Sequence, residues 1–415
     1  MKIAIVGSGI AGLTCAYLLN RQHDIQVFEA SDWIGGHTHT VDVQVDGRSY
    51  AIDTGFIVFN DWTYPNFIRL LEQIGVGFKP TEMSFSVSDP ATGVEYNGHD
   101  LNTLFAQRSN LLSPAFWGML RDILRFNRQS LDDLANNRIS ADTTLGQYLD
   151  SNGYGRRFIE HYIVPMGSAI WSMSLADMLG FPLQFFVRFC KNHGLLSVSD
   201  RPTWQVIEGG SRSYVAPLTA SFAERIRLNC PVSRVVRDQD GVTLHSAAGS
   251  ERFDKVIFAC HSDQALALLD QASEKESEIL GALPYANNDV VLHTDTRLLP
   301  KRKLAWASWN YRLGGPREQM AAVTYDMNIL QGIDSDTTFC VSLNQTAAID
   351  PSKILARFQY AHPQYSLAGT AAQARWEELL GAQHTYYCGA YWANGFHEDG
   401  VVSALRVARA FGETL

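Results

Sequence analysis

A glycine-rich turn that joins a short apolar strand to a helical pattern limits most strongly the folds open to this chain. Residues 2–6 (KIAIV) predict a buried parallel strand, and Gly7, Gly9 and Gly12 follow it directly. In such a loop the first glycine permits a tight turn, the second lets the backbone approach a pyrophosphate, and the third lets the helix pack close to the sheet. A second strand ends at Glu29, near the spacing expected of an acid that binds ribose hydroxyls. The unit predicts a βαβ fold that binds a dinucleotide.

A glycine pair and a hairpin follow this unit. Gly35 and Gly36 predict either an ordinary turn or a second close approach of the backbone to the cofactor. Residues 41–53 alternate apolar and polar side chains around an Asp46-Gly47 turn, which predicts a β-hairpin.

Composition excludes several classes of protein. The 415 residues suffice for about two domains. A net charge of −9 without a basic block argues against nucleic acid as a partner. Six widely spaced cysteines, without a C-x-x-C pair, predict reduced thiols in a cytoplasmic protein rather than a disulfide framework or a zinc site. His37 and His39 lack further ligands at suitable spacing, so no metal site is expected.

The N-terminal stretch from residue 3 to residue 19 carries no charge. An export signal needs a more basic start and a small-residue cleavage site, and a spanning helix needs about 20 apolar residues. The three glycines of this stretch suit neither, and no other stretch approaches membrane-spanning length. We therefore expect a cytoplasmic protein.

The order of the expected elements predicts two interleaved domains. Residues 66–199 have a mainly helical pattern, whereas strand and turn patterns dominate residues 203–265 and 280–345. The tail returns to a strand, a turn and a helix over residues 400–411. We predict an α/β protein with a Rossmann-like dinucleotide-binding domain in three chain segments and a substrate domain that combines a mixed sheet with helices. The segments are 1–65, 200–265 and 380–415 for the first domain, and 66–199 and 266–379 for the second.

Several of these motifs together resemble the FAD-binding amine oxidase superfamily. They are the first glycine loop, Glu29, the Gly35-Gly36 pair and a late strand, residues 387–389, that ends before a helix. The resemblance implies an amine oxidase-like fold, FAD as the dinucleotide, and a last strand–helix unit that closes over the flavin. The FAD-binding residues that it implies are Gly7, Gly9, Ile10, Ala11, Gly12, Glu29, Ala30, Gly35, Gly36, His37, Thr38, Gly55, Phe56, Ile57, Val232, Gly389, Gly400, Val401 and Val402.

Longer strings resemble a narrower group, the flavin-dependent amino-terminal module of plant-type cyclopropane fatty acid synthases and its free-standing bacterial relatives. They include FIVFNDWTYPNF (56–67), IVPMGSAIWS (163–172) and YYCGAYWANGFHEDG (386–400). This resemblance implies a role beside a lipid-modifying methyltransferase. The sequence has no second glycine-rich nucleotide loop with its own strand and acid, so a methyltransferase would be a separate partner.

The sequence departs from familiar amine oxidases, which place a lysine near flavin N5. The strand that resembles its carrier, residues 287–293, contains no lysine, and in a rough register Asp289 or a neighbour takes its place. The cysteine that tethers the flavin in some relatives has no clear counterpart, and Cys388 is expected to be a small buried strand residue. FAD is therefore expected to be bound non-covalently.

The densest polar and aromatic cluster lies at residues 391–399, which the same resemblance places near the pyrimidine side of the flavin. Tyr391 and His397 are the candidate catalytic residues, since histidine titrates near neutrality and can transfer a proton. The alternative is that His397 and the two acids after it fix the loop or cap the final helix. Asn60 and Tyr64 leave a similar choice between substrate contact and loop capping.

Two aromatic stretches, residues 116–128 and 181–191, carry basic residues at helical spacing. A basic amphipathic helix can lie on an anionic membrane, whereas an aromatic stripe is also typical of a protein core. Exposed helices of this kind would place the protein at the inner membrane surface and give an acyl chain a route to the flavin.

Three functions remain open. We expect an FAD-dependent oxidoreductase that desaturates or reduces a lipid acyl chain beside a lipid methyltransferase. The second is an amine oxidase-like enzyme that acts on a soluble amine or polyene. The third is a non-catalytic flavoprotein that binds lipid or a partner enzyme.

Overall fold

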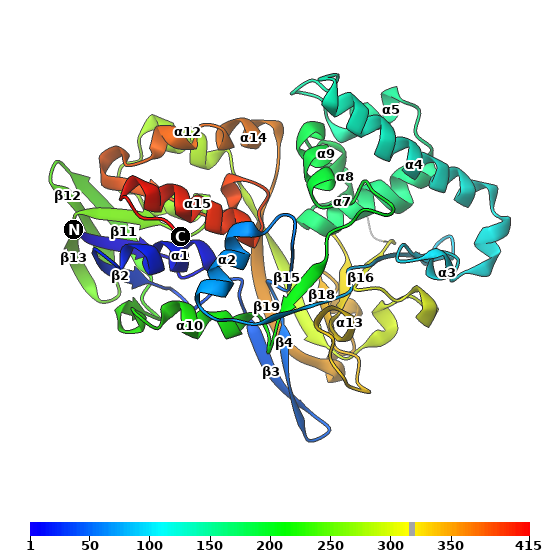
Figure 1. The fold of residues 1–415 in the computed structure, drawn as a ribbon, viewed down its shortest axis with the longest axis horizontal. Coiled ribbons are helices and arrows are strands. Elements are labelled where there is room, and N and C mark those ends of the chain that lie inside the picture. Colours follow the sequence, from blue (N-terminus) through cyan, green and yellow to red (C-terminus); the bar gives the residue numbers. More distant parts are fainter. Residues whose placement is uncertain (315–319) are drawn as a thin grey trace.

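A five-stranded parallel sheet stands at one end of the computed structural model, which describes residues 1–314 and 320–415 (Figure 1). Its strands come from three separated parts of the chain, because β1 pairs with β2 on one side and with β14 on the other. In spatial order they are β10 (Ile226–Arg227), β2 (Asp24–Phe28), β1 (Lys2–Val6), β14 (Lys255–Phe258) and β20 (Thr385–Tyr387).

Strand β1 is apolar and buried from Ile3 to Val6 because both faces of this sheet are covered. Ile3 and Ile5 pack with α1 (Ile10–Leu19) and α15 (His397–Ala410) in one core. Ala4 and Val6 pack in another core with an antiparallel sheet on the opposite face. That sheet consists of β11 (Val232–Asp238), β12 (Gly241–Ser246) and β13 (Gly249–Phe253), and α11 (Ser262–Leu268) and α12 (Glu274–Gly281) pack in the same core. Helix α10 (Val215–Thr219) packs against α1 on the other face.

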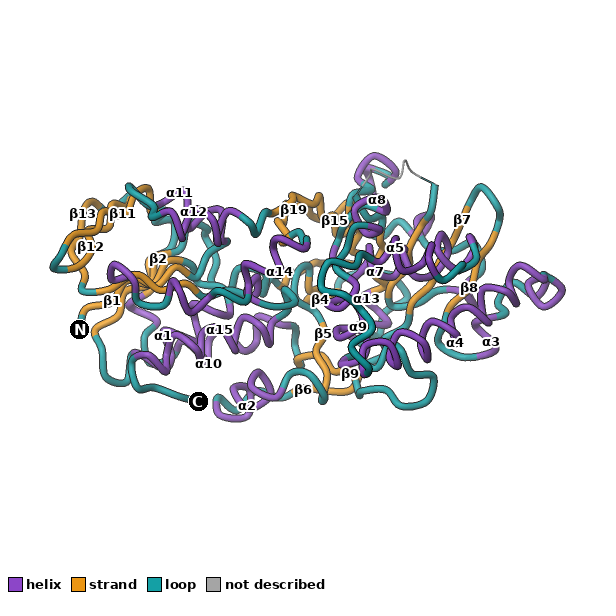
Figure 2. The backbone as a smooth tube through the Cα atoms, turned by 90° about the horizontal axis from the view of Figure 1, so that it is seen from above, coloured by secondary structure: helices purple, strands orange, loops and turns teal. Residues whose placement is uncertain are grey.

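A seven-stranded mixed sheet forms the centre of the other part, and its long strands β15 (Tyr285–His293) and β19 (Ile354–Pro363) lie between the two ends of the molecule (Figure 2). Neighbouring strands are antiparallel except for the parallel pair β7 and β16. The remaining strands are β18 (Cys340–Leu343), β17 (Val323–Asp326), β16 (Trp309–Arg312), β7 (Phe85–Asp89) and β8 (Val94–Asn97).

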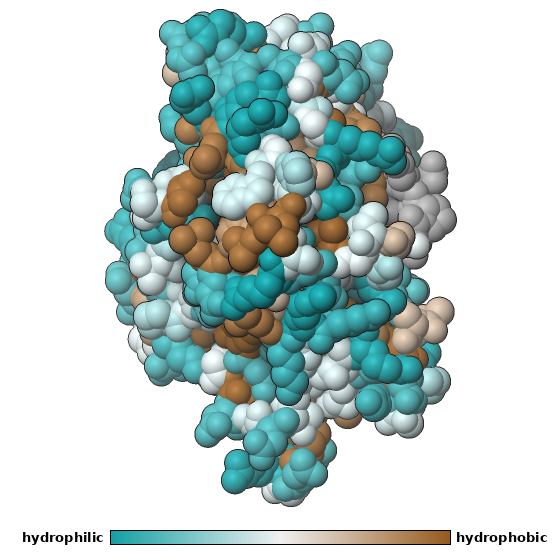
Figure 3. Space-filling view, turned by 90° about the vertical axis from the view of Figure 1, so that its right-hand side faces the viewer, coloured by the Kyte–Doolittle hydropathy of each residue, from teal (hydrophilic) through white to brown (hydrophobic). Residues whose placement is uncertain are grey.

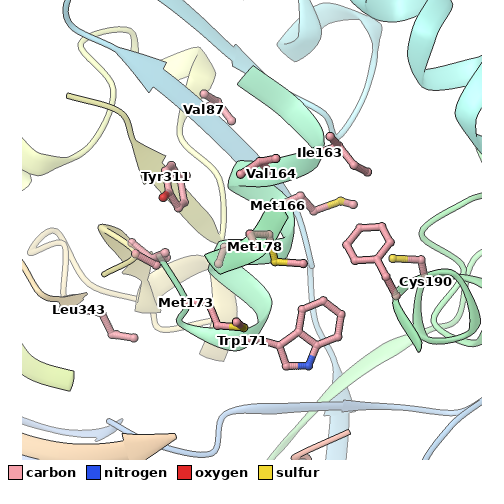
Figure 4. Packing of buried hydrophobic residues seen from close by; sticks show 14 of the residues in the cluster. Val87, Ile163, Val164, Met166, Trp171, Met173, Met178, Cys190, Tyr311 and Leu343 are labelled. Carbon is pink, nitrogen blue, oxygen red and sulfur yellow. The ribbon is translucent and has the colours of Figure 1, made fainter. Parts of the chain in front are cut away.

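Helices cover this sheet and form the largest hydrophobic core with it. Figure 4 shows Met166 and Trp171 of this core between Tyr311 of the sheet and Cys190 of a more distant helix. The helices that follow one another in the chain are α4 (Pro114–Ala135), α5 (Leu145–Ser151), α6 (Arg156–Phe158), α7 (Val164–Trp171), α8 (Leu175–Leu179) and α9 (Leu183–Asn192). Two short helices come later in the chain, α13 (Met327–Gln331) after β17 and α14 (Leu367–Gln373) after β19. Within the described residues, no helix is long and apolar enough to cross a membrane.

Two small sheets connect the parts. The predicted hairpin is present as β3 (Thr40–Val45) and β4 (Arg48–Asp53), and its turn residues Asp46 and Gly47 both have positive φ, as this tight turn requires. The other small sheet joins β5 (Val58–Asn60), β9 (Trp204–Ile207) and β6 (Phe78–Pro80). Helix α2 (Pro65–Gln73) lies between β5 and β6 in the chain.

The α/β fold class is confirmed, but several expected elements differ. The mainly helical segment also supplies β7 and β8, since residues 84–97 alternate small polar and apolar side chains that the helical expectation overlooked. The final helix begins at His397 rather than at residue 400. The second stretch considered for membrane contact, residues 181–191, is a core helix, since its aromatic residues Phe181, Phe186 and Phe189 are buried.

Candidate active site

A cavity of about 690 Å³ opens where the parallel strands end and the mixed sheet begins. Its lining includes Val6 at the end of β1, Phe28 at the end of β2, and Gly389 just after β20. Across from them lie Tyr285 and Val290 of β15. The carboxyl ends of parallel strands are the usual place for a bound dinucleotide, so this cavity is the candidate site.

The glycines of the first loop are required by close backbone contacts. A Cβ atom on Gly7, whose φ is +105°, would lie 2.9 Å from the carbonyl oxygen of Ala259. A Cβ atom on Gly12 would lie 2.0 Å from the carbonyl oxygen of Gly7. A Cβ atom on Gly36 would lie 3.2 Å from Cα of Gly9, so the glycine pair packs directly on the first loop. The two segments present bare backbone to the cavity, as a pyrophosphate site needs.

Glu29 lines the cavity, but its carboxylate is already engaged by the protein. Oε2 accepts hydrogen bonds from the backbone N–H and the hydroxyl of Ser8, and Oε1 accepts from the same groups of Ser31. Burial raises the pKa of Glu29, but these hydrogen bonds outweigh burial and hold the pKa below its usual value. The acid is thus ionised and fixes the glycine loop to the end of β2.

Most of the residues predicted to bind FAD lie in this lining, and that binding role stays a prediction. They are Gly7, Gly9, Ile10, Ala11, Glu29, Ala30, Gly35, Gly36, His37, Gly55, Phe56, Ile57, Val232 and Gly389, together with the catalytic candidates Tyr391 and His397. The other predicted residues are not part of the lining, and they are Gly12, Thr38, Gly400, Val401 and Val402. A Cβ atom on Gly400 would lie 2.8 Å from Cγ2 of Ile10, so this glycine brings α15 close to α1.

Several residues of the lining carry buried polar atoms without a partner in the described protein. Nε2 of His37 and the hydroxyls of Tyr365 and Tyr391 are buried and make no hydrogen bond within the described residues. Such atoms cost free energy unless a ligand or water satisfies them. A polar dinucleotide therefore fits this lining, because it would supply the missing partners.

Three histidines that line the cavity, His37, His261 and His362, lie close together. The ring of His37 lies 6.2 Å from that of His261 and 5.5 Å from that of His362, centroid to centroid. Burial lowers the pKa of His37 and His261 to about 4 and that of His362 to about 3. Among the described residues of the lining there is neither a lysine nor an arginine. The cavity is therefore lined by neutral imidazoles around neutral pH.

The second catalytic candidate, His397, is held by several contacts at the start of α15. Its Nε2 lies 3.0 Å from Oγ1 of Thr38 and 3.1 Å from the hydroxyl of Tyr214, and its ring stacks on Phe56. Burial lowers its pKa well below the usual value. The neutral ring is therefore held in one orientation as part of the cavity wall.

The two acids after His397 bind backbone N–H groups of nearby loops and helices. This agrees with the alternative that they fix the loop or cap the final helix. Oδ2 of Asp399 accepts from the backbone N–H groups of Asn394 and Phe396, and Glu398 accepts from those of Asn66 and Phe67. Asn60 has a similar role, since its Oδ1 accepts from the N–H groups of residues 62 and 63. Tyr64 lines a second cavity of about 380 Å³ together with His193 and Phe396.

Of Asp289 and its neighbours, which were considered for the place of a lysine, Asp289 itself does not face the cavity. Strand side chains alternate between the two faces of a sheet, and Asp289 is exposed, where its Oδ1 accepts from Gln359. Its neighbour Val290 is 1% exposed and lines the cavity. The position on β15 that faces the cavity is therefore apolar. Cys388 is buried as expected, one residue beyond the end of β20.

Sequence reasoning missed most of the wall beyond the glycine loops. That wall is aromatic and aliphatic, and it consists of Ile170, Trp171, Val290, Trp309, Tyr325, Leu343, Tyr360 and Tyr365. These residues come from five strands, a helix and a loop that are far apart in the chain, so local spacing gave no signal. Ile170 and Trp171 belong to the string at residues 163–172 and Val290 to the strand at residues 287–293, but none of the three was itself predicted to line the site.

A glycine-loop βαβ unit that opens on an apolar cavity beside a second, mixed sheet defines the class of FAD-dependent oxidoreductases. Residues 10–327 match the family model described as flavin containing amine oxidoreductase. The chain belongs to this family, and its cofactor is FAD.

Relatives and solved structures agree with this assignment. The tomato (Solanum lycopersicum) zeta-carotene desaturase is 37% identical over 76 residues, which are 18% of this chain and 12% of that protein. A putrescine oxidase double mutant superposes with a TM-score of 0.70 at 15% identity, covering 99% of this chain and 98% of the other. A fatty acid isomerase from P. acnes gives a TM-score of 0.70 at 16% identity with the same coverage. The two structural likenesses show the shared fold.

Proposed function

We propose that this FAD-dependent oxidoreductase acts on a lipid acyl chain, which it desaturates or reduces. The observation that carries the proposal is the apolar wall of the cavity, to which β15 contributes Val290 and no lysine. Transfer of a hydrocarbon chain from water to such a wall is favourable by about 25 cal/mol per Å² of apolar surface buried.

The charge of the lining disfavours a cationic substrate. Glu29 is its single carboxylate within the described residues, and both oxygens already accept hydrogen bonds from Ser8 and Ser31. An ammonium group that entered this cavity would lose its hydration without gaining a free counter-charge. An uncharged chain has no such cost.

Acyl chain chemistry needs a hydride and a proton to leave, or to join, adjacent carbons, and FAD is the group that takes or gives the hydride. This chain's residues supply the rest. The wall from Trp171 to Tyr365 excludes water and aligns the substrate. The hydroxyl of Tyr391 is buried and unpaired within the described structure, so it is the group we assign to hydrogen-bond the flavin or to carry the proton.

Relatives support a chain-like substrate. The tomato relative is named as a desaturase of zeta-carotene, and one solved structure of the same fold is named as a fatty acid isomerase. The strings that resemble cyclopropane fatty acid synthase modules support a lipid methyltransferase as partner. We therefore propose a location in the cytoplasm at the inner membrane surface, with copurification of a methyltransferase as its test.

Anaerobic visible spectroscopy of the purified holoprotein tests the substrate. Phospholipid vesicles with saturated chains are added in one cell, and a panel of amines in another. Bleaching of the flavin band by lipid alone is the expected result for desaturation. For the opposite direction, the chemically reduced holoprotein should regain its colour with unsaturated vesicles. Lipid that has no effect in either direction contradicts the proposal.

A matched pair of variants makes the test specific to the cavity. Val290→Thr adds a hydroxyl to the cavity wall, whereas Val291→Thr adds one to the opposite face of β15, where Val291 packs with Leu298 and Ile349. Both residues are 1% exposed, so both variants lose similar stability. We expect Val290→Thr alone to slow the lipid-dependent change in the flavin band, by about tenfold. Equal slowing in both variants contradicts a role of this wall in substrate binding.

A soluble amine or polyene is the second candidate. Its support is the cluster of Trp171, Tyr360 and Tyr365 in the lining, because aromatic faces attract cations and stack on polyenes. Bleaching by an amine but not by lipid would favour it.

A further inference from the structure

We propose that the outer face of α3, η1 and α4 docks this protein on an anionic lipid surface. Here α3 is Leu101–Leu104, η1 is the 3-10 helix Arg108–Leu112, and α4 follows after Ser113. The inference rests on the proposed function, since an enzyme that acts on acyl chains must reach them in a bilayer. We call residues 101–128 of these elements the docking face.

Apolar side chains are concentrated on the docking face. Leu112 is 88% exposed and Leu101 76% exposed, and Leu124, Trp117 and Leu111 are about half exposed. They are five of the ten large apolar side chains that are exposed in the described residues, yet they lie within 24 positions of the chain. Figure 3 looks at this end of the molecule, and apolar residues gather near the middle of the view. Exposed apolar side chains gathered in this way mark an interaction surface.

Helical spacing sorts α4 into two faces. Trp117, Arg121, Leu124 and Arg128 follow one another at intervals of three or four and are all exposed. The opposite face packs into the hydrophobic core through Phe116, Met119 and Phe126. The exposed face therefore alternates apolar and basic side chains, as in helices that lie in a membrane interface.

The excess of arginines on the docking face favours an anionic surface as its partner. Residues 101–131 contain four arginines and a single acid, Asp122, in a chain whose net charge is −9. Asp122 is buried and paired with Arg125. The guanidinium of Arg108 donates to the carbonyl and side-chain oxygens of Asn102 and to the carbonyl of Phe105 rather than to a carboxylate. In the described structure no carboxylate pairs with Arg121 or Arg128, so both are free to meet lipid phosphates.

The docking face is rigidly connected to the interior. Nε1 of Trp117 donates to the carbonyl oxygen of Leu111, which joins α4 to η1, and the Trp117 ring lies 5.5 Å from that of Phe105. The buried side of α4 belongs to the same core as Trp171, which lines the active-site cavity. Ring contacts continue from this side to the cavity, because Phe126 of α4 lies 6.3 Å from Phe186 of α9, which lies 5.9 Å from Trp171.

Sedimentation of the full-length holoprotein with vesicles tests the proposal. One set of vesicles is phosphatidylcholine alone, and the other contains phosphatidylglycerol as well. We expect binding to the anionic set only, and a loss of that binding at high salt. No binding to anionic vesicles, or equal binding to both sets, would overturn the proposal.

Variants locate the surface. Arg121→Gln with Arg128→Gln should lower the partition coefficient at least tenfold, because each basic residue near an anionic surface contributes about 1 kcal/mol. Leu112→Ser with Leu124→Ser should lower it by a similar factor through lost apolar burial. Val198→Ser is the control, since Val198 is 69% exposed outside the docking face. A control that loses as much binding as either double variant contradicts the assignment, and so does a double variant that binds as the parent does.

Two further measurements separate this inference from the proposed function. Brominated lipids should quench the fluorescence of the parent more than that of Trp117→Phe, whether or not the enzyme turns over. Acyl substrate dispersed in detergent should reach the flavin of the arginine double variant as readily as that of the parent. If only the vesicle experiment fails, docking is wrong and the proposed function stands; if only the flavin experiment fails, the reverse holds. A parent protein that forms dimers through Leu112 and Leu124 in solution, detected by light scattering, would instead assign the face to a second copy.

Discussion

The imidazole of His397 lies flat against the ring of Phe56, with centroids 3.5 Å apart and planes inclined by 12°. His397 begins α15 and Phe56 lies in the loop after β4, so the contact joins the last helix to an early loop within the cavity wall. On its edge the imidazole meets the hydroxyls of Thr38 and Tyr214, which also hydrogen-bond each other. The ring thus closes a buried polar network while it packs as an aromatic.

These two kinds of contact can be separated by substitution. His397→Phe keeps the stack on Phe56 and loses the hydrogen bonds, whereas His397→Asn keeps a polar group and loses the stack. We expect each to reduce the free energy of unfolding by about 1–2 kcal/mol. Urea denaturation measures the loss, and the exposed His99→Gln should change little. A stability of His397→Phe equal to that of the parent would show that the polar network is unimportant.

Stability should fall as the pH falls from about 6.5 to 4. Burial lowers the pKa of His37, His261 and His362 in the folded protein, while unfolded histidine titrates near 6.5. Below that pH the unfolded state therefore binds protons that the folded state does not, and protonation favours unfolding. Burial holds the pKa of His193 and His293 near 4, which adds to the effect.

Four carboxyls act in the opposite direction. Burial raises the pKa of Asp53, Asp326 and Asp399 to about 6 and also raises the pKa of Glu398, so the folded state binds their protons first. The histidines are more numerous, so the net effect is a loss. Urea midpoints between pH 7.5 and pH 4.5 measure it, and His362→Gln should flatten the curve. Stability that rises through this range would contradict the neutral histidine cluster.

Gly12→Ala should abolish FAD retention. Its Cβ atom would lie 2.0 Å from the carbonyl oxygen of Gly7, so α1 would have to move away from β1 and open the loop. The ratio of flavin to protein absorbance in the purified protein reports the loss. Gly118→Ala is the matched control, since no atom lies within 4 Å of its Cβ position, and it should retain FAD and gain up to about 1 kcal/mol of helix stability. Full flavin content in Gly12→Ala would refute the packing argument.

A pair of tyrosines distinguishes a ligand-directed hydroxyl from a structural one. The hydroxyl of Tyr391 lacks a partner in the described protein, so Tyr391→Phe should leave the free energy of unfolding of the FAD-free protein unchanged or raise it. The hydroxyl of Tyr387 donates to Glu276 at 2.6 Å, so Tyr387→Phe should lower it by about 1–2 kcal/mol. Fluorescence titration with FAD should show weaker binding for Tyr391→Phe alone. Unchanged affinity there would mean that this hydroxyl faces substrate or solvent instead.

The sequence could predict the parts of the site that depend on local backbone geometry. The loop from Gly7 to Gly12 must be glycine because neighbouring backbone leaves no space for a Cβ, and that requirement is readable from spacing. It could not predict which side of β15 faces the cavity, since a shift of one residue exchanges Asp289 for Val290. Nor could it bring His261 and His362 to His37, because their approach depends on how strands far apart in the chain pack together.

The three-segment origin of the parallel sheet has a consequence for the order in which the protein matures. The glycine loop is synthesised long before β20 and α15. These two elements complete the sheet and the cavity wall, and they lie after residue 384. Until they arrive, β14 keeps an open edge and α1 lacks the helix that buries its outer side. The nascent chain would therefore have to stay competent for cofactor capture until α15 has been made, and FAD would enter a protein whose β1 and α15 fold together.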